Sequence, residues 1–263
     1  MPAVYAHDRF GIKVQEQMKE SLHTIAERYH SAYQDGLQGP DIFFFYRPWF
    51  KNRVQRYGEW LHENSAAPFF RHALSIVRKY GRNSSQYAYL LGFICHFTLD
   101  SECHPYIDAQ IERSGVAHLE IEAEFEKYLL HEDGFDPVGY DPSVLIYSDA
   151  GTAEAIAPFF PSINRKTAGE ALYVMQLVKK LFRTSCPVKQ EALNTVMRLA
   201  GVYHEMNGLI YQRKDNPLCV ESSRELQTRF EQAIPLAAAL QEQFDECLRT
   251  GKSLPDRFHR TFE

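Results

Sequence analysis

The sequence predicts an all-α fold in which several helices pack as a bundle. Apolar residues recur at intervals of three and four along most of the chain, which places them on one face of a helix. Strict alternation of apolar and polar residues, the pattern of a half-buried strand, is not sustained anywhere. Clusters of glycine and proline separate the helical segments, so we expect these segments to be distinct helices.

The first predicted helix covers residues 10–29, and its apolar stripe faces the core. His7 stands one turn earlier on the same face, so its imidazole is expected to face the core as well. Taken alone, His7 is better explained as a cap or packing residue than as a functional one. The stripe consists of Phe10, Val14, Met18, Leu22, Ile25 and Tyr29.

Glycine and proline at positions 36–40 end the helical pattern, and Asp41 follows directly. Two interpretations of Asp41 remain open. Its carboxylate can cap a helix or form a turn. Alternatively, a loop presents it to a cleft walled by the aromatic residues 43–46.

A third helical pattern covers residues 54–79, and Pro68 predicts a break within it. This segment contains two histidines, His62 and His72, that are candidates for a functional site. Periodicity does not choose between them.

The stretch 92–122 organises the rest of the chain. An apolar run at residues 87–99 suits a helix that is buried on nearly all sides. Within this helix, His96 and Asp100 stand four residues apart, so that imidazole and carboxylate point to the same place. Gly92 lies one turn earlier on that face and is expected to leave room for a bulky group beside the pair.

A second pair follows closely. His104 comes after a further four residues, and Pro105 is expected to interrupt the helix there. The next helix carries His118 and Glu122, again four residues apart. Because an ionised carboxylate in an apolar helix is costly unless it is paired or bound to a metal, these imidazoles and carboxylates together predict a metal site. Histidine and carboxylate ligands without thiolates favour zinc, with manganese or iron possible.

Beyond residue 130 the helical pattern weakens. Prolines and glycines make residues 131–162 a long irregular connection, with room for a short helix near 152–157. We expect one domain over residues 1–263, in which helices at 165–249 complete a bundle begun by the motif-bearing part at 1–130. The later helical patterns cover residues 165–182, 188–211 and 221–249, and the polar tail at 251–263 is expected to be irregular.

Composition limits the possible partners. Hydrophobic residues make up 44% and charged residues 24% of the chain, as in ordinary globular proteins. The net charge of -5 gives no electrostatic reason to expect binding to nucleic acid or to anionic membranes. No apolar stretch is long enough to predict a transmembrane helix, and the first residues lack a secretory signal pattern. Five cysteines, an odd number without CxxC spacing, favour a reducing, cytoplasmic environment.

The ordered series of histidines and acidic residues resembles the zinc-dependent phospholipase C family, which is similar in turn to the fungal single-strand nucleases. The resemblance spans about residues 1–130 and implies an α-helical bundle around a cluster of two or three zinc ions. The matching pieces are MPAVYAHDRFG, GLQGPDIFFFY, LHE at 61–63, LGFICHFTLDSECHPYI and HLEIE.

The resemblance also implies a ligand set. In it, the aspartate of the HxxxD pair bridges two metals, and His62 fits better than His72 because it stands in the LHE motif. Secreted members of the family use the amine of a processed N-terminal residue as a ligand, and removal of Met1 would leave the amine of Pro2 here. The implied ligands are His7, Asp41, His62, His96, Asp100, His104, His118 and Glu122.

A metal cluster of this kind supports hydrolysis of a phosphoester by metal-activated water. Asp41 is either a ligand or the general base for that water. A phospholipid headgroup ester, a nucleotide or a small phosphomonoester suits such metals equally well. Two alternatives remain: a nuclease or nucleotide phosphatase of the same architecture, and a non-catalytic helical protein whose metal site is structural or lost.

Overall fold

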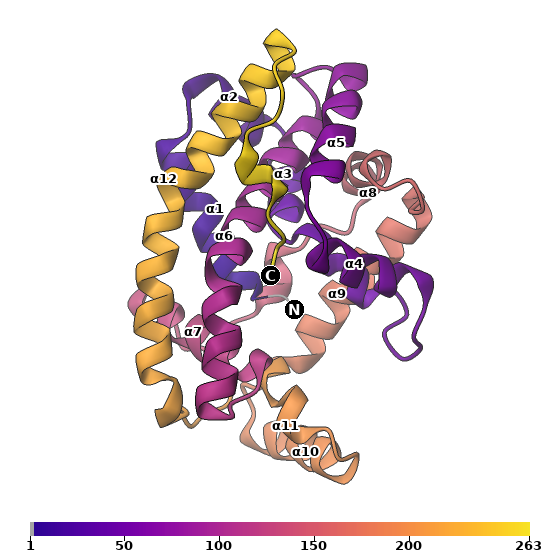
Figure 1. Cartoon of the computed structure of the whole chain (residues 1–263). Coiled ribbons are helices and arrows are strands. Elements are labelled where there is room, and N and C mark those ends of the chain that lie inside the picture. Colours follow the sequence, from indigo (N-terminus) through magenta and orange to yellow (C-terminus); the bar gives the residue numbers. More distant parts are fainter. Residues whose placement is uncertain (1–2) are drawn as a thin grey trace.

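A computed structural model describes residues 3–263, and helices account for most of them (Figure 1). Within this described part there is no strand, which confirms the all-α prediction. The first half contains α1 (Val4–Gln17), α2 (Glu20–Arg28), α3 (His30–Gly36), the 3₁₀ helix η1 (Gly39–Phe45), α4 (Arg53–Glu63), α5 (Ala67–Tyr80), α6 (Ser85–Ser114) and α7 (His118–Glu132).

The second half has more short elements. Across residues 3–263, no helix combines the length and the apolar character needed to cross a membrane. The elements are η2 (Pro142–Leu145), α8 (Ala150–Ile156), η3 (Ala157–Phe159), α9 (Arg165–Phe182), α10 (Pro187–Leu199), α11 (Tyr203–Met206), η4 (Asn207–Leu209), η5 (Pro217–Cys219), α12 (Val220–Thr250) and η6 (Asp256–His259).

Helix α6 runs through the middle of the molecule and packs against α3 and α12 (Figure 1). Its first half is buried on all sides, as the apolar run predicted. Gly92 serves this packing, because a Cβ there would lie 2.1 Å from the carbonyl oxygen of Tyr33 on α3. The expectation that Gly92 makes room beside the histidine–aspartate pair is therefore wrong: the space is filled by the backbone of α3.

The expected interruption at Pro105 is also wrong, because α6 continues through it to Ser114. A proline inside a helix leaves the carbonyl four residues earlier without its usual N–H partner. Here that carbonyl belongs to Ser101, and it accepts a hydrogen bond from Nη2 of Arg260 at 2.7 Å. A side chain from the C-terminal segment thus replaces the missing helical hydrogen bond.

Two other predicted helices are divided. The helix expected over residues 10–29 is two helices, because the backbone is extended at Met18, whose side chain turns into the core. The helix expected over 188–211 ends before Gly201, which has a φ of +71° and stops α10. The break predicted near Pro68 is confirmed between α4 and α5, and α8 lies within the long connection at 131–162.

The C-terminal segment after Gly251 returns from the end of α12 to the middle of the molecule (Figure 1). It is irregular apart from η6, as expected, yet its aromatic residues Phe258 and Phe262 are fully buried. The ring of Phe262 lies 5.4 Å from that of His62 and 5.9 Å from that of His96, measured between centroids. The tail is therefore part of the core.

Gly39 allows η1 to approach α6 closely. Its φ is +52°, and a Cβ at this position would lie 2.1 Å from Cδ2 of His96. Gly115, the residue that ends α6, also has a positive φ of +70°, but a Cβ there would meet nothing within 4 Å among the described residues. Both glycines therefore have a positive φ that favours glycine, but only at Gly39 would a Cβ also collide with a neighbouring side chain.

We predict that Gly39→Ala destabilises the zinc-free protein more than Gly115→Ala does. Gly115→Ala is the control, and it should lower the free energy of unfolding by about 1 kcal/mol because of its backbone conformation alone. Gly39→Ala should cost about 1–3 kcal/mol more, because His96 must move out of its packed position. Urea unfolding monitored by circular dichroism measures both values, and equal losses would contradict the close contact.

Candidate metal centre

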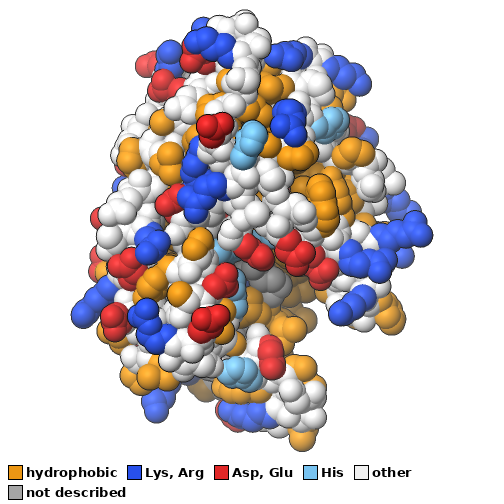
Figure 2. All heavy atoms as spheres, viewed as in Figure 1, with side chains coloured by type: hydrophobic (Ala, Val, Ile, Leu, Met, Phe, Trp, Pro, Cys, Tyr) orange, Lys and Arg blue, Asp and Glu red, His pale blue; other side chains and the backbone are white. Residues whose placement is uncertain are grey.

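The structure brings all eight candidate ligands together from five elements. His7 comes from α1, Asp41 from η1 and His62 from α4, while α6 and α7 supply the remaining side chains. Seven of the eight residues are buried, and His118 is half-buried. In Figure 2, histidine and acidic side chains gather around a hollow near the centre of this face.

The eight side chains form three groups, in each of which the potential ligand atoms lie within 4.8 Å of one another. The groups are connected, because His96 belongs to two of them. They consist of His7, His96 and Asp100; of Asp41, His62 and His96; and of His104, His118 and Glu122.

Asp100 lies at the centre of this arrangement. Its Oδ2 is 2.9 Å from Nε2 of His96, and its Oδ1 is 3.2 Å from Nε2 of His7. Nε2 of His104 lies 3.9 Å from the same Oδ1. Because α6 is not interrupted, His96, Asp100 and His104 follow one another at four-residue spacing along a single helix face. The continuous helix thus explains how His104 reaches the group.

The second group joins η1 to α4 and α6. Nε2 of His62 lies 3.0 Å from Oδ1 of Asp41. Nδ1 of His62 lies 2.8 Å from the carbonyl oxygen of Gly58, and Nδ1 of His96 lies 3.1 Å from that of Leu37. Since a carbonyl only accepts, each Nδ1 carries the proton and each Nε2 presents a lone pair to the cluster.

The third group is built by helical spacing on α7. Nε2 of His118 lies 3.1 Å from Oε1 of Glu122, and Nε2 of His104 lies 3.6 Å from the same oxygen. His104 therefore stands between Glu122 and Asp100 and connects the third group to the first.

The chemistry of these atoms fits a metal ion. Within residues 3–263, the buried ligand atoms without a hydrogen-bond partner include Nε2 of His62, His96 and His118, and Oδ1 of Asp41. Each of these atoms lies 2.9–3.1 Å from an atom of another candidate ligand. Two ligands on a tetrahedral zinc ion lie about 3.3 Å apart. Converging lone pairs at this separation, without hydrogen bonds to satisfy them, are the arrangement that a cation between them stabilises.

The charges of the site compensate one another. Burial alone would raise the pKa of Asp100, but the imidazoles of His96, His104 and His7 hold it well below its usual range. Positive charge around Glu122, to which the imidazoles of His118 and His104 contribute, likewise lowers its pKa against the effect of burial. Burial would lower the pKa of His104, but Asp100 and Glu122 raise it to about 9. Metal binding must therefore displace a proton from this imidazole and becomes easier as the pH rises toward 9.

Glu126, which sequence reasoning missed, fixes the position of His7. Its Oε1 accepts hydrogen bonds from the backbone N–H groups of Tyr5 at 2.5 Å and Ala6 at 3.0 Å. These N–H groups belong to the first turn of α1, where a carboxylate also interacts favourably with the helix dipole. Oε2 of Glu126 accepts from the hydroxyl of Tyr211 at 2.8 Å. A signal was available, because Glu126 follows Glu122 by four residues on α7.

The structure distinguishes between the two open interpretations of Asp41. The residue lies in the first turn of a 3₁₀ helix, and its carboxylate faces His62 and His96. The neighbouring Phe43 is fully buried in the core, and its ring lies 4.7 Å from that of Phe160. Asp41 thus stands in a 3₁₀ helix rather than in a loop, and its convergence on histidine is observed. Of the aromatic residues that follow it, Phe43 belongs to the core, while the ring of Phe44 lies 5.4 Å from that of His62.

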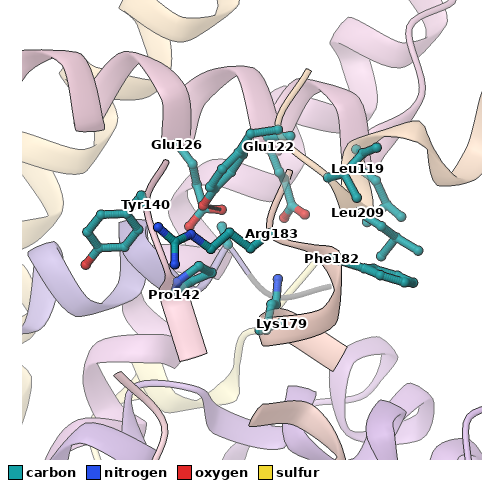
Figure 3. Close-up of a pocket in the computed structure, with 14 residues that line it drawn as sticks. Leu119, Glu122, Glu126, Tyr140, Pro142, Lys179, Phe182, Arg183 and Leu209 are labelled. Atoms are coloured by element: carbon teal, nitrogen blue, oxygen red, sulfur yellow. Dashed lines mark hydrogen bonds between the residues drawn. The ribbon is translucent and has the colours of Figure 1, made fainter. Parts of the chain in front are cut away.

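A pocket lies directly beside the third group and is lined by Glu122, Glu126, Lys179 and Arg183, among others. Figure 3 shows Lys179 reaching into it from α9, on the opposite side from the two glutamates of α7. Burial lowers the pKa of Lys179, and the charges of Glu126 and Glu122 oppose that shift. No local sequence signal marks Lys179, because it stands in an ordinary amphipathic helix.

His72, the alternative to His62, lies outside the three groups. Its Nε2 is 3.2 Å from the carbonyl oxygen of Pro158. The amine of Pro2, the remaining candidate ligand, lies outside the described residues.

We predict that His62→Ala and His72→Ala differ in their effect on zinc content. His62→Ala removes a member of the second group and should lower the zinc bound per chain. His72→Ala should leave zinc content unchanged and cost about 1 kcal/mol of stability through the lost hydrogen bond. Elemental mass spectrometry after dialysis, with thermal unfolding in parallel, checks both outcomes; greater zinc loss in His72→Ala would show that the wrong histidine has been assigned.

Comparison with known proteins agrees with this geometry. A family model described as zinc dependent phospholipase C matches residues 7–174, which is more than half of the chain and includes all eight candidate ligands. Neither a search of curated proteins nor a search of solved structures gives a match. The chain belongs to the zinc-dependent phospholipase C family.

Proposed function

We propose that the protein is a zinc-dependent phosphoester hydrolase. The observation that carries this proposal is the convergence of buried imidazole and carboxylate atoms, among which Nε2 of His62 and His96 and Oδ1 of Asp41 have no hydrogen-bond partner among the described residues. Membership of a family of zinc-dependent phospholipases supports it. The proposed ligands are His7, Asp41, His62, His96, Asp100, His104, His118 and Glu122.

The shared histidine limits how the ions are distributed. Nδ1 of His96 is turned to the carbonyl of Leu37, so only Nε2 is available to a metal. His96 can therefore serve the first group or the second, but not both at once. With the third group on the other side of Asp100, this arrangement is suited to two or three ions.

We assign Asp41 as a ligand rather than as the general base. Burial would raise its pKa, yet the positive charge around it, to which the imidazoles of His62 and His96 contribute, lowers the pKa. A carboxylate with so low a pKa is a weak proton acceptor at neutral pH. Its position within 3.0 Å of Nε2 of His62 suits a shared metal.

Zinc bound to these residues supplies a Lewis acid for phosphoryl oxygens and lowers the pKa of water in contact with it. The protein's own side chains hold the ligand atoms in a fixed arrangement. Gly58 and Leu37 orient the imidazoles of His62 and His96 through their carbonyls, and Phe262 packs against both rings. A buried, preorganised site of this kind excludes bulk water from the reacting phosphate.

We propose that the functional unit extends beyond the motif-bearing part at 1–130. Helix α12 packs on α6, and Arg260 completes the hydrogen bonding of α6. Helix α9 contributes Lys179 to the pocket beside the metal groups. The helices of the C-terminal half are therefore needed to shape the site.

The proposed activity is tested on zinc-loaded protein with bis(p-nitrophenyl) phosphate, p-nitrophenyl phosphate and phospholipid vesicles. We expect hydrolysis of a phosphoester that a chelator abolishes and added zinc restores. His118→Ala should lower the rate by at least about 100-fold, while helix content stays near that of the wild type. Loss of a residue that only hydrogen-bonds to a metal ligand already costs up to about 100-fold, and loss of a ligand itself should cost no less.

His131→Ala is the matched control, because His131 is an exposed histidine on the same helix and outside the three groups. It should retain wild-type activity. Unchanged hydrolysis in His118→Ala would contradict the proposed centre. Zinc binding without hydrolysis of any substrate would instead support a structural metal site.

A further inference from the structure

The pocket beside the third group has a composition that points to the kind of substrate bound there. It opens between α7, α9 and the segment after η4, and Glu122 connects it directly to the candidate metal centre. Apolar side chains, including Leu119 and Phe182, form one side of it (Figure 3). A phosphoester held at Glu122 would therefore extend the rest of its alcohol or headgroup into this pocket.

Two cations line the pocket. Lys179 stands in the last turn of α9, and Arg183 directly follows the last residue of that helix; both side chains line the pocket. Arg183 reaches across the pocket toward Tyr140 (Figure 3). Its Nη1 forms an ion pair with Oδ2 of Asp141 at 3.9 Å, which is too long for a hydrogen bond. Its guanidinium therefore keeps donors for a ligand.

The acidic groups of the pocket are already engaged by the protein. Glu122 lies against His118 and His104 in the third group. Glu126 accepts hydrogen bonds at both oxygens, from the backbone of Tyr5 and Ala6 and from the hydroxyl of Tyr211. Neither carboxylate is therefore placed to receive a cationic headgroup such as choline.

We infer that this pocket is a subsite for a second anionic group on the substrate, bound by Lys179 and Arg183. The inference rests on the proposed function, since the first anionic group is the phosphate at the metal centre. It assigns the substrate class as phosphoesters whose alcohol or headgroup carries a further phosphate or carboxylate. Zwitterionic choline esters should bind less well.

Binding calorimetry on zinc-loaded protein tests the subsite without depending on turnover. The two probes are 2-phosphoglycolate, which carries a phosphate and a carboxylate, and choline phosphate, which carries a phosphate and a cation. We expect 2-phosphoglycolate to bind at least about tenfold more tightly, as expected for one charge-assisted hydrogen bond. Lys179→Gln and Arg183→Gln should each reduce this preference, and together they should abolish it.

Lys180→Gln is the matched control, because it removes the same charge from an exposed neighbouring lysine and should leave the preference intact. Equal affinity for the two probes, a preference that survives in the double variant, or no binding of either probe would overturn the subsite. Hydrolysis of phosphoesters without the preference would reject the subsite and leave the proposed function standing. A preference for 2-phosphoglycolate without hydrolysis of any phosphoester would support the subsite and contradict the proposed function.

Discussion

Burial of the Asp100 carboxylate is the constraint on which the centre of this molecule depends. An isolated ionised carboxylate inside a helical bundle is strongly unfavourable. Asp100 is surrounded by three imidazoles, two from its own helix and that of His7 from α1. The position of α1 is in turn fixed by Glu126, which binds the first N–H groups of that helix. Charge compensation thus determines how three helices are arranged.

The same constraint explains why parts of the chain far from the motifs are needed. A proline disfavours the helical conformation of the residue before it, here His104. Helix α6 nevertheless continues through Pro105, and Arg260 donates a hydrogen bond to the carbonyl of Ser101 that the proline leaves without its usual partner. The C-terminal Phe262 covers the rings of His62 and His96. Residues at the two ends of the chain therefore meet at one site.

Local helix geometry made part of this site predictable from the residues alone. The pairs His96–Asp100 and His118–Glu122 depend only on four-residue spacing, which places side chains on one helix face whatever the tertiary structure. His7, Asp41 and His62 lie on separate elements, and only the resemblance to a known family indicated that they belong together. Their convergence depends on helix packing, which single-sequence periodicity does not contain.

The errors have physical causes of the same kind. Pro105 was expected to break α6, but a side chain more than 150 positions away compensates for the lost hydrogen bond. Gly92 was assigned to the site, but it serves the contact between α6 and α3. Lys179 and Arg183 acquire their importance only from the pocket that they share with α7. In each case a long-range contact determined the role of a locally ambiguous residue.

Glu122 and Glu126 illustrate how neighbouring acids can take different roles. Both project from α7 toward the same pocket (Figure 3). Glu122 meets two imidazoles, and its low pKa suits a ligand of a metal ion. Glu126 is surrounded by N–H and O–H donors, and it stabilises the start of α1. The donors around each carboxylate decide its role.

Zinc anomalous diffraction from crystals of zinc-loaded protein tests most directly whether the three groups form one metal centre. A connected centre predicts two or three zinc peaks, one of them bounded by His104, His118 and Glu122 and another in contact with Nε2 of His96. Absence of zinc between these side chains, or zinc bound only at surface positions, would contradict the proposed centre.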